Sequence, residues 1–143
     1  MLSSSPLFDM LSDNELESVA ELSRPRHFRA GQAVFEEGEL GDCVYVIVSG
    51  EVEIVHRDSA GQQRTLKLLS SPECFGEMSL LDKEYRSATA RAKTDAELLQ
   101  LSAEDLTTFR EQYRDGFTFL VINIAKVLAA RLREANLRLL DER

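Results

Sequence analysis

The sequence predicts an α+β domain, mainly β, in which antiparallel strands are flanked by helices at both ends of the chain. Between residues 33 and 101, β-branched and aromatic runs recur roughly every eight to twelve positions with glycine-containing turns between them, which is typical of an antiparallel sandwich or barrel. Before and after this region, apolar residues recur at helical spacing. With 143 residues, 43% of them hydrophobic, the chain is long enough to form a single domain with its own core.

The N-terminal segment, residues 1–25, is expected to be helical. Ser12 and Glu15 have the spacing of a capping box, and the apolar Leu11 precedes them. Apolar residues then recur on one face until Pro25, which we expect to end the helix. This helix is expected to pack on the domain that follows.

Residues 26–101 are expected to form the β region. The run at 44–48 is continuously apolar and β-branched, whereas 51–55 alternates polar and apolar residues, as a half-buried strand does. Gly31, Gly50 and Gly61 are assigned to turns and to no other role. The expected strands are 34–35, 44–48, 51–55, 64–69, 89–93 and 97–101.

Residues 102–143 are expected to be helical again, with one helix beginning at Ser102 and a longer one at 117–140, after Gly116. The longer helix would measure about 36 Å, more than one small β domain can cover. We interpret its apolar stripe as the seam of a homodimer; the alternative is a core helix with a solvated end. The stripe comprises Phe117, Val121, Ile124 and Leu128, resumed at Leu132, Ala135 and Leu139.

Composition excludes several classes of function. A net charge of −8 argues against nucleic-acid binding by this chain, because phosphate contacts require clustered Lys and Arg. The two cysteines, Cys43 and Cys74, and the two histidines are too few and too scattered for a metal site. We expect both cysteines to be small buried hydrophobes in a reducing, cytoplasmic protein that does not bind membranes. There is no recognisable signal peptide or membrane-spanning run.

The most informative stretch is residues 75–90, FGEMSLLDKEYRSATA. Gly76 lets a ligand approach the backbone, and the helical turn expected after it presents free amides to an anion. Arg86 supplies a planar fork of donors that matches a phosphate. Glu77 is unfavourable beside a phosphate alone, but it can accept a hydrogen bond from a hydroxyl of the same ligand. A phosphate and a sugar hydroxyl together indicate a nucleotide.

Two blocks of the chain resemble the cyclic nucleotide-binding domain family, which includes the bacterial catabolite activator protein and the regulatory subunits of cyclic-AMP-dependent protein kinase. Residues 34–54, VFEEGELGDCVYVIVSGEVEI, resemble the first half of the family's β-roll, and residues 75–90 resemble its phosphate-binding cassette. The resemblance implies a jelly-roll-like, antiparallel double-stranded β-helix with flanking helices, forming one domain over residues 1–143. It also implies a non-enzymatic sensor.

The resemblance further implies roles for individual residues. Glu77 would bind the ribose 2′-hydroxyl and Arg86 the cyclic phosphate. Serine at position 87 resembles the bacterial pattern and favours cyclic AMP over cyclic GMP. Additional backbone donors would come from Gly76, Met78, Ser87 and Ala88.

The chain departs from the family's bacterial activators in two places. Their long helix offers a Thr-Ser pair to the adenine, whereas the corresponding positions here are Ala135 and Asn136, of which Asn136 can still bond a purine edge. The activators also continue into a helix-turn-helix domain, whereas this sequence ends at Arg143. We therefore expect either a freestanding sensor that acts through a protein partner or the sensor portion of something longer.

The sequence argues against two other classes of function. A degenerate β-roll that serves only as a scaffold for protein interaction and dimerisation would be expected to lose Glu77 or Arg86, and both are present. A cupin-like metal enzyme would need clustered histidines, whereas His27 and His56 are isolated.

Overall fold

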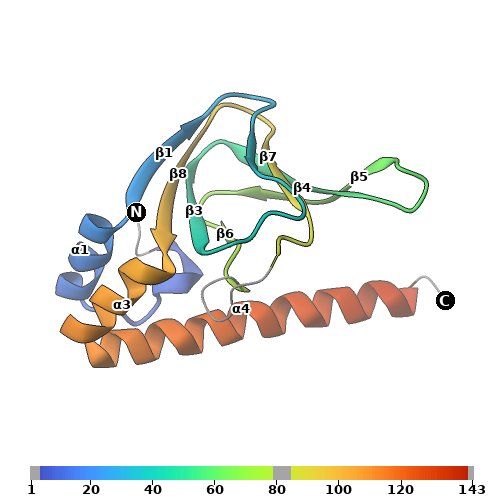
Figure 1. The fold of residues 1–143 in the computed structure, drawn as a ribbon. Helices are drawn as coiled ribbons and strands as arrows, with labels where there is room; N and C mark the ends of the chain where they lie inside the picture. Colours follow the sequence, from blue (N-terminus) through green and yellow to red (C-terminus); the bar gives the residue numbers. More distant parts are fainter. Residues whose placement is uncertain (1–3, 79–84, 142–143) are drawn as a thin grey trace.

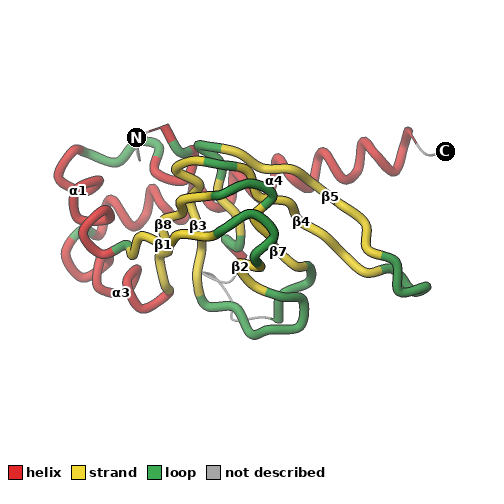
Figure 2. Tube along the Cα trace, turned by 90° about the horizontal axis from the view of Figure 1, so that it is seen from above, coloured by secondary structure: helices red, strands yellow, loops and turns green. Residues whose placement is uncertain are grey.

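The computed structural model describes residues 4–78 and 85–141, and it has two four-stranded antiparallel sheets flanked by helices (Figures 1 and 2). One sheet has the strand order β1-β8-β3-β6 and the other β2-β7-β4-β5. The predicted fold class is confirmed. The strands are β1 Arg24–Phe28, β2 Ala33–Phe35, β3 Cys43–Ser49, β4 Glu51–Arg57, β5 Gln63–Ser70, β6 Cys74–Phe75, β7 Thr89–Ala92 and β8 Ala96–Ser102.

Strand β3 is continuously apolar over residues 43–48 because most of this run is buried on both faces. Val44 and Val46 belong to the core formed with the helices, whereas Tyr45 and Ile47 belong to the core between the two sheets. Alternate residues of a strand point to opposite faces, so a strand between two cores needs apolar residues at every position. This accounts for the continuous run at 44–48.

Pro25 does not end the first helix as expected. The helix ends earlier, at Leu22, and Pro25 lies inside β1, where it pairs with Leu99 of β8. Strand β1 is at the edge of its sheet, so a residue without an N–H is tolerated there.

The first helices cover one end of the β region (Figure 1). A short 3₁₀ helix, η2 (Pro6–Phe8), precedes α1 (Asp13–Leu22), and the predicted capping box at the start of α1 is confirmed. The Ser12 hydroxyl accepts from the Glu15 amide at 3.3 Å, and the Glu15 carboxylate accepts from the Ser12 amide at 2.8 Å.

The C-terminal segment forms α3 (Ala103–Gln112) and the long α4 (Arg114–Asp141). Helix α4 begins before Gly116, not after it, so this glycine lies within the helix. A Cβ at this position would lie 3.0 Å from the Phe109 ring and would collide with the Glu15 carboxylate. Gly116 therefore allows α4 to approach α1 and α3 closely.

The two halves of α4 have different surroundings. In the first half, Leu120 and Ile124 are buried in the core, and Asn123 donates to the carbonyls of Leu7 (3.1 Å) and Asp9 (2.6 Å). Phe117 and Leu128 of the predicted seam pack against this same core. In the second half the leucines are exposed, among them Leu132 at 63%. Ile124 of the predicted seam is thus a core residue, whereas Val121 is 37% exposed, and the seam interpretation stays a prediction. None of the described helices is long and apolar enough to cross a membrane.

Candidate ligand-binding site

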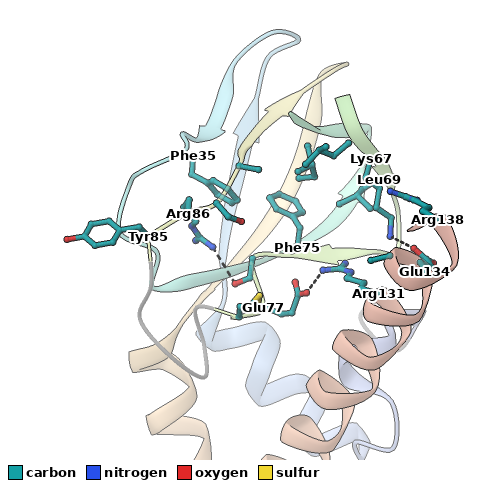
Figure 3. A pocket seen from close by; sticks show the side chains of 17 residues that line it. Phe35, Lys67, Leu69, Phe75, Glu77, Tyr85, Arg86, Arg131, Glu134 and Arg138 are labelled. Atoms are coloured by element: carbon teal, nitrogen blue, oxygen red, sulfur yellow. Dashed lines mark hydrogen bonds and ion pairs between the residues drawn. The ribbon is translucent and has the colours of Figure 1, made fainter. Parts of the chain in front are cut away.

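A cavity of about 400 Å³ opens between the β2-β7-β4-β5 sheet, residues 75–78 and 85–88, and the second half of α4 (Figure 3). Its walls combine apolar side chains from the strands with charged side chains from these residues, from the helix and, at Lys67, from β5. The described lining residues are Phe35, Ile54, Leu66, Lys67, Leu69, Phe75, Gly76, Glu77, Met78, Tyr85, Arg86, Ser87, Ala88, Arg131, Glu134, Ala135 and Arg138.

Arg86 is held firmly on one wall of the cavity. Its side chain is buried, with 8% of the residue exposed, and its Nη2 donates to the Cys43 carbonyl at 2.9 Å. The guanidinium lies 4.0 Å from the centre of the Phe35 ring, a cation–π contact. Its backbone is fixed by hydrogen bonds with Gly38 (2.8 Å) and Glu39 (2.7 Å). Burial lowers the pKa of the Arg86 guanidinium from its ordinary value.

Gly76 makes this placement of Arg86 possible. Its φ of +79° lies in the left-handed region that glycine adopts at little cost. A Cβ at this position would lie 2.7 Å from Nη1 of Arg86 and 3.1 Å from the Cys43 carbonyl oxygen. Any other residue would therefore displace the guanidinium as well as strain the backbone.

Glu77 is the other buried charged group of the cavity, with 3% of the residue exposed. Its Oε1 accepts a hydrogen bond from Arg131 of α4, and the same guanidinium donates to the Cys74 carbonyl. Its Oε2 has no hydrogen-bond partner among the described residues. A buried acceptor without a partner is costly, so this oxygen is suited to accept a donor from a ligand.

The charge of the cavity is opposite to that of the chain. Four cationic and two anionic side chains are found among its described lining residues, although the chain as a whole carries −8. The apolar part includes Phe75, whose ring is stacked on Tyr45 at 5.3 Å and lies 5.9 Å from the Phe35 ring. The cavity thus offers an anion site beside apolar walls.

Comparison with known proteins identifies the family of the chain. The family model described as "Cyclic nucleotide-binding domain" matches residues 25–113, more than half of the chain. The chain belongs to the cyclic nucleotide-binding domain family. Domains of this family are non-enzymatic sensor modules, so the expectation that the domain is not an enzyme is confirmed.

Among curated proteins, the chain is 41% identical over 135 residues to the cyclic AMP receptor protein of Thermus thermophilus, which covers 94% of this chain. The chain spans only 61% of that relative's length. The crystal structure of the Thermus thermophilus catabolite activator protein superposes with a TM-score of 0.83, at 40% identity and with coverage of 94% of this chain and 61% of that one.

Two further solved structures extend the likeness. The N-terminal domain of a transcriptional regulator from Streptomyces coelicolor matches with a TM-score of 0.83 at 30% identity, covering 96% of this chain and 94% of that one. The regulatory domain of Toxoplasma gondii protein kinase A, solved with cyclic AMP, matches with a TM-score of 0.69 at 27% identity. The match covers 76% of this chain and 41% of that one.

The structure brings six of the seven predicted site residues to the cavity. These are Gly76, Glu77, Met78, Arg86, Ser87 and Ala88 of the predicted cassette. The seventh, Asn136, is exposed on α4 and is absent from the described lining, whereas its neighbour Ala135 is part of it. Most of the helical turn expected after Gly76 falls in residues 79–84, outside the described part of the chain.

Sequence reasoning missed the charged side chains that α4 and β5 contribute to the cavity. Arg131, Glu134 and Arg138 follow one another at three- and four-residue spacing and so share one helix face, and Lys67 on β5 lies opposite them. That spacing is visible in the sequence. The seam interpretation used only the apolar residues of the same helix and gave these charged residues no role.

Both cysteines are buried and unpaired by any disulfide, as expected of small hydrophobes. Burial raises the pKa of each thiol to about 11. Near the cavity these residues act through their backbone. The Cys43 carbonyl accepts a hydrogen bond from Arg86, and the Cys74 carbonyl accepts one from Arg131.

Proposed function

We propose that this domain is a cytoplasmic sensor that binds cyclic AMP in the cavity and couples binding to the position of α4. The observation that carries the proposal is the pair of buried charged groups on the cassette. Arg86 can donate to a cyclic phosphate, while Oε2 of Glu77 can accept from a ribose 2′-hydroxyl. The volume of about 400 Å³ lies in the range typical of small-molecule pockets.

Cyclic AMP is favoured over cyclic GMP on two grounds. Ser87, rather than threonine, lines the cavity beside Arg86. The Thermus thermophilus relative is named for cyclic AMP, and the Toxoplasma gondii structure contains it. The surplus of cationic side chains in the cavity supports an anionic ligand, and its apolar walls suit the faces of a purine.

Coupling to α4 is supported by the contact between Glu77 and Arg131. A hydroxyl bound at Oε2 would share the carboxylate with the guanidinium on α4, so occupancy of the cavity would bias the position of that helix. A ligand shifts such an equilibrium only by its differential affinity for the two positions. The exposed leucines of the second half support dimerisation through α4, and the output would pass to a downstream protein partner.

Isothermal titration calorimetry with a panel of nucleotides tests the proposal. We expect cyclic AMP to bind more tightly than cyclic GMP, and 5′-AMP to bind weakly because its phosphate carries more charge and is not held by the ring. The 2′-deoxy analogue of cyclic AMP should bind about tenfold more weakly than the parent, since it leaves Oε2 of Glu77 without a partner. Equal binding of the 2′-deoxy analogue would remove the role given to Glu77. Absence of binding by every nucleotide would favour a ligand-independent scaffold.

Hydrogen exchange and a mass measurement test the coupling and the dimer. Saturating cyclic AMP is expected to slow amide exchange in the second half of α4, and light scattering is expected to give twice the mass of the chain. The double variant Leu132→Glu, Leu139→Glu should reduce the mass to that of a monomer, because it places four charges in the seam of the dimer. Met10→Glu, at an equally exposed position away from α4, is the control and should leave the mass unchanged. Exchange in α4 that does not respond to ligand would contradict the coupling.

A further inference from the structure

The end of the cavity away from Arg86 carries charged side chains that the phosphate and ribose roles do not use. Lys67 of β5 and Glu134 and Arg138 of α4 gather there, while Arg86 and Tyr85 lie at the opposite end (Figure 3). The Lys67 ammonium lies 3.3 Å from Oε2 of Glu134, so this pair connects the strand to the helix. Both side chains are partly exposed, which makes the pair a weak source of stability and leaves it accessible to a ligand.

The two cassette roles fix the direction in which a nucleotide would lie. With its phosphate at Arg86 and its ribose hydroxyl at Glu77, the base of the ligand extends toward the remaining part of the cavity. Ile54, Leu66 and Leu69 supply apolar surface along that path. The polar edge of the base would then meet the side chains at the far end, where Ala135 has no hydrogen-bonding side chain.

We propose that Glu134 is the residue that determines base specificity, accepting a hydrogen bond from the 6-amino group of adenine while Lys67 holds its carboxylate in position. The inference rests on the proposed function and deepens it. An ionised carboxylate only accepts hydrogen bonds, and it has two oxygens, of which Oε2 bonds Lys67 and Oε1 is the second acceptor. Adenine presents an amino donor at carbon 6, where guanine and hypoxanthine present a carbonyl acceptor.

The same geometry disfavours a 6-oxo purine. A carbonyl oxygen facing Glu134 would bring two acceptors together, and the contact would be repulsive. Arg138 lies on the same helix face as Glu134 and also lines the cavity. Selection of the amino purine is therefore assigned to Glu134 and not to Asn136, which is exposed outside the described lining.

Calorimetry with three ligands and four proteins tests this inference. The ligands are cyclic AMP, purine riboside 3′,5′-cyclic monophosphate, which has hydrogen at carbon 6, and cyclic IMP, which has a carbonyl there. The wild type is expected to bind cyclic AMP about tenfold more tightly than the 6-hydrogen analogue, because a charge-assisted hydrogen bond is lost. In Glu134→Ala the affinities for cyclic AMP and the 6-hydrogen analogue should agree within about twofold, so that their ratio falls. The difference in affinity between cyclic AMP and cyclic IMP should also become smaller.

Two further variants distinguish recognition of the base by Glu134 from a general effect on α4. Lys67→Met should lower the same ratio while keeping the carboxylate, since it removes the group that positions it. Glu111→Ala, at an exposed carboxylate at the end of α3, should leave the ratio at its wild-type value.

The outcomes distinguish this inference from the proposed function. If Glu134→Ala weakens all three ligands by the same factor, or none of them, Glu134 does not read the base and the inference is wrong, although the domain still binds cyclic nucleotides. If the ratio in Lys67→Met equals that of the wild type, the positioning role of Lys67 is overturned. If the wild type binds none of the three ligands, the proposed function and this inference both fail.

Discussion

Replacing Arg86 with alanine is expected to weaken the binding of cyclic AMP by about a hundredfold or more. The guanidinium offers two parallel donors to a phosphate, and each charge-assisted hydrogen bond contributes about 1.5–3 kcal/mol. The group is already positioned by the Cys43 carbonyl and by the Phe35 ring, so little ordering is needed when the ligand arrives. Calorimetric titration with cyclic AMP measures the loss.

Loss of the side chain also affects the protein without ligand, so the test needs two additional variants. Arg86→Lys keeps the charge but not the fork, and it should bind between the wild type and Arg86→Ala. Arg29→Ala removes an exposed arginine outside the described lining and should bind as the wild type does. Thermal unfolding of each variant identifies any that fails to fold. Binding by folded Arg86→Ala within twofold of the wild type would contradict the phosphate role.

The predicted features that the structure shows are those encoded locally. Six cassette residues reach the cavity because they lie within thirteen positions of one another, and the capping box depends on residues three positions apart. Strand positions followed from alternation and β-branching, which are also local. Where local chemistry decides the structure, one sequence is sufficient to predict it.

The features that were missed depend on contacts between distant segments. Arg131 binds Glu77 across 54 positions, and Glu134 meets Lys67 across 67. Pro25 is tolerated because β1 lies at a sheet edge, and Gly116 is needed because three helices meet there. A single sequence contains no signal for which segments become neighbours, so these roles became visible only with the fold.

The glycines show most clearly the difference between what local sequence predicts and what depends on distant contacts. Gly50 and Gly61 both lie between consecutive strands, both have positive φ (+88° and +81°), and the sequence assigns both to turns alone. The structure separates them. A Cβ on Gly61 would meet nothing within 4 Å, whereas a Cβ on Gly50 would collide with the Asp95 carbonyl oxygen and lie 2.8 Å from Cα of Ala96.

Gly50 is tightly packed because two crossings between the sheets meet at that point. The chain passes from one sheet to the other at Gly50, between β3 and β4, and it passes back at residues 93–95, between β7 and β8. The two crossings are joined by hydrogen bonds, in which the Lys93 amide donates to the Glu51 carbonyl (2.9 Å) and the Glu51 amide donates to the Thr94 hydroxyl (3.0 Å). Neither backbone can move away from a new methyl group without breaking these bonds.

We therefore expect Gly50→Ala to destabilise the domain by about 2–5 kcal/mol, from left-handed backbone strain together with overpacking. Gly61→Ala is the matched control, since it carries the same strain without the collision, and should cost only about 1–2 kcal/mol. Urea unfolding followed by circular dichroism measures the free energy of unfolding of both variants. An m-value equal to that of the wild type would show that their unfolding transitions can be compared. Equal losses in the two variants would mean that the crossing at residues 93–95 can shift away from Gly50. A much larger loss in Gly50→Ala would show that the crossing at residues 93–95 cannot shift away from Gly50.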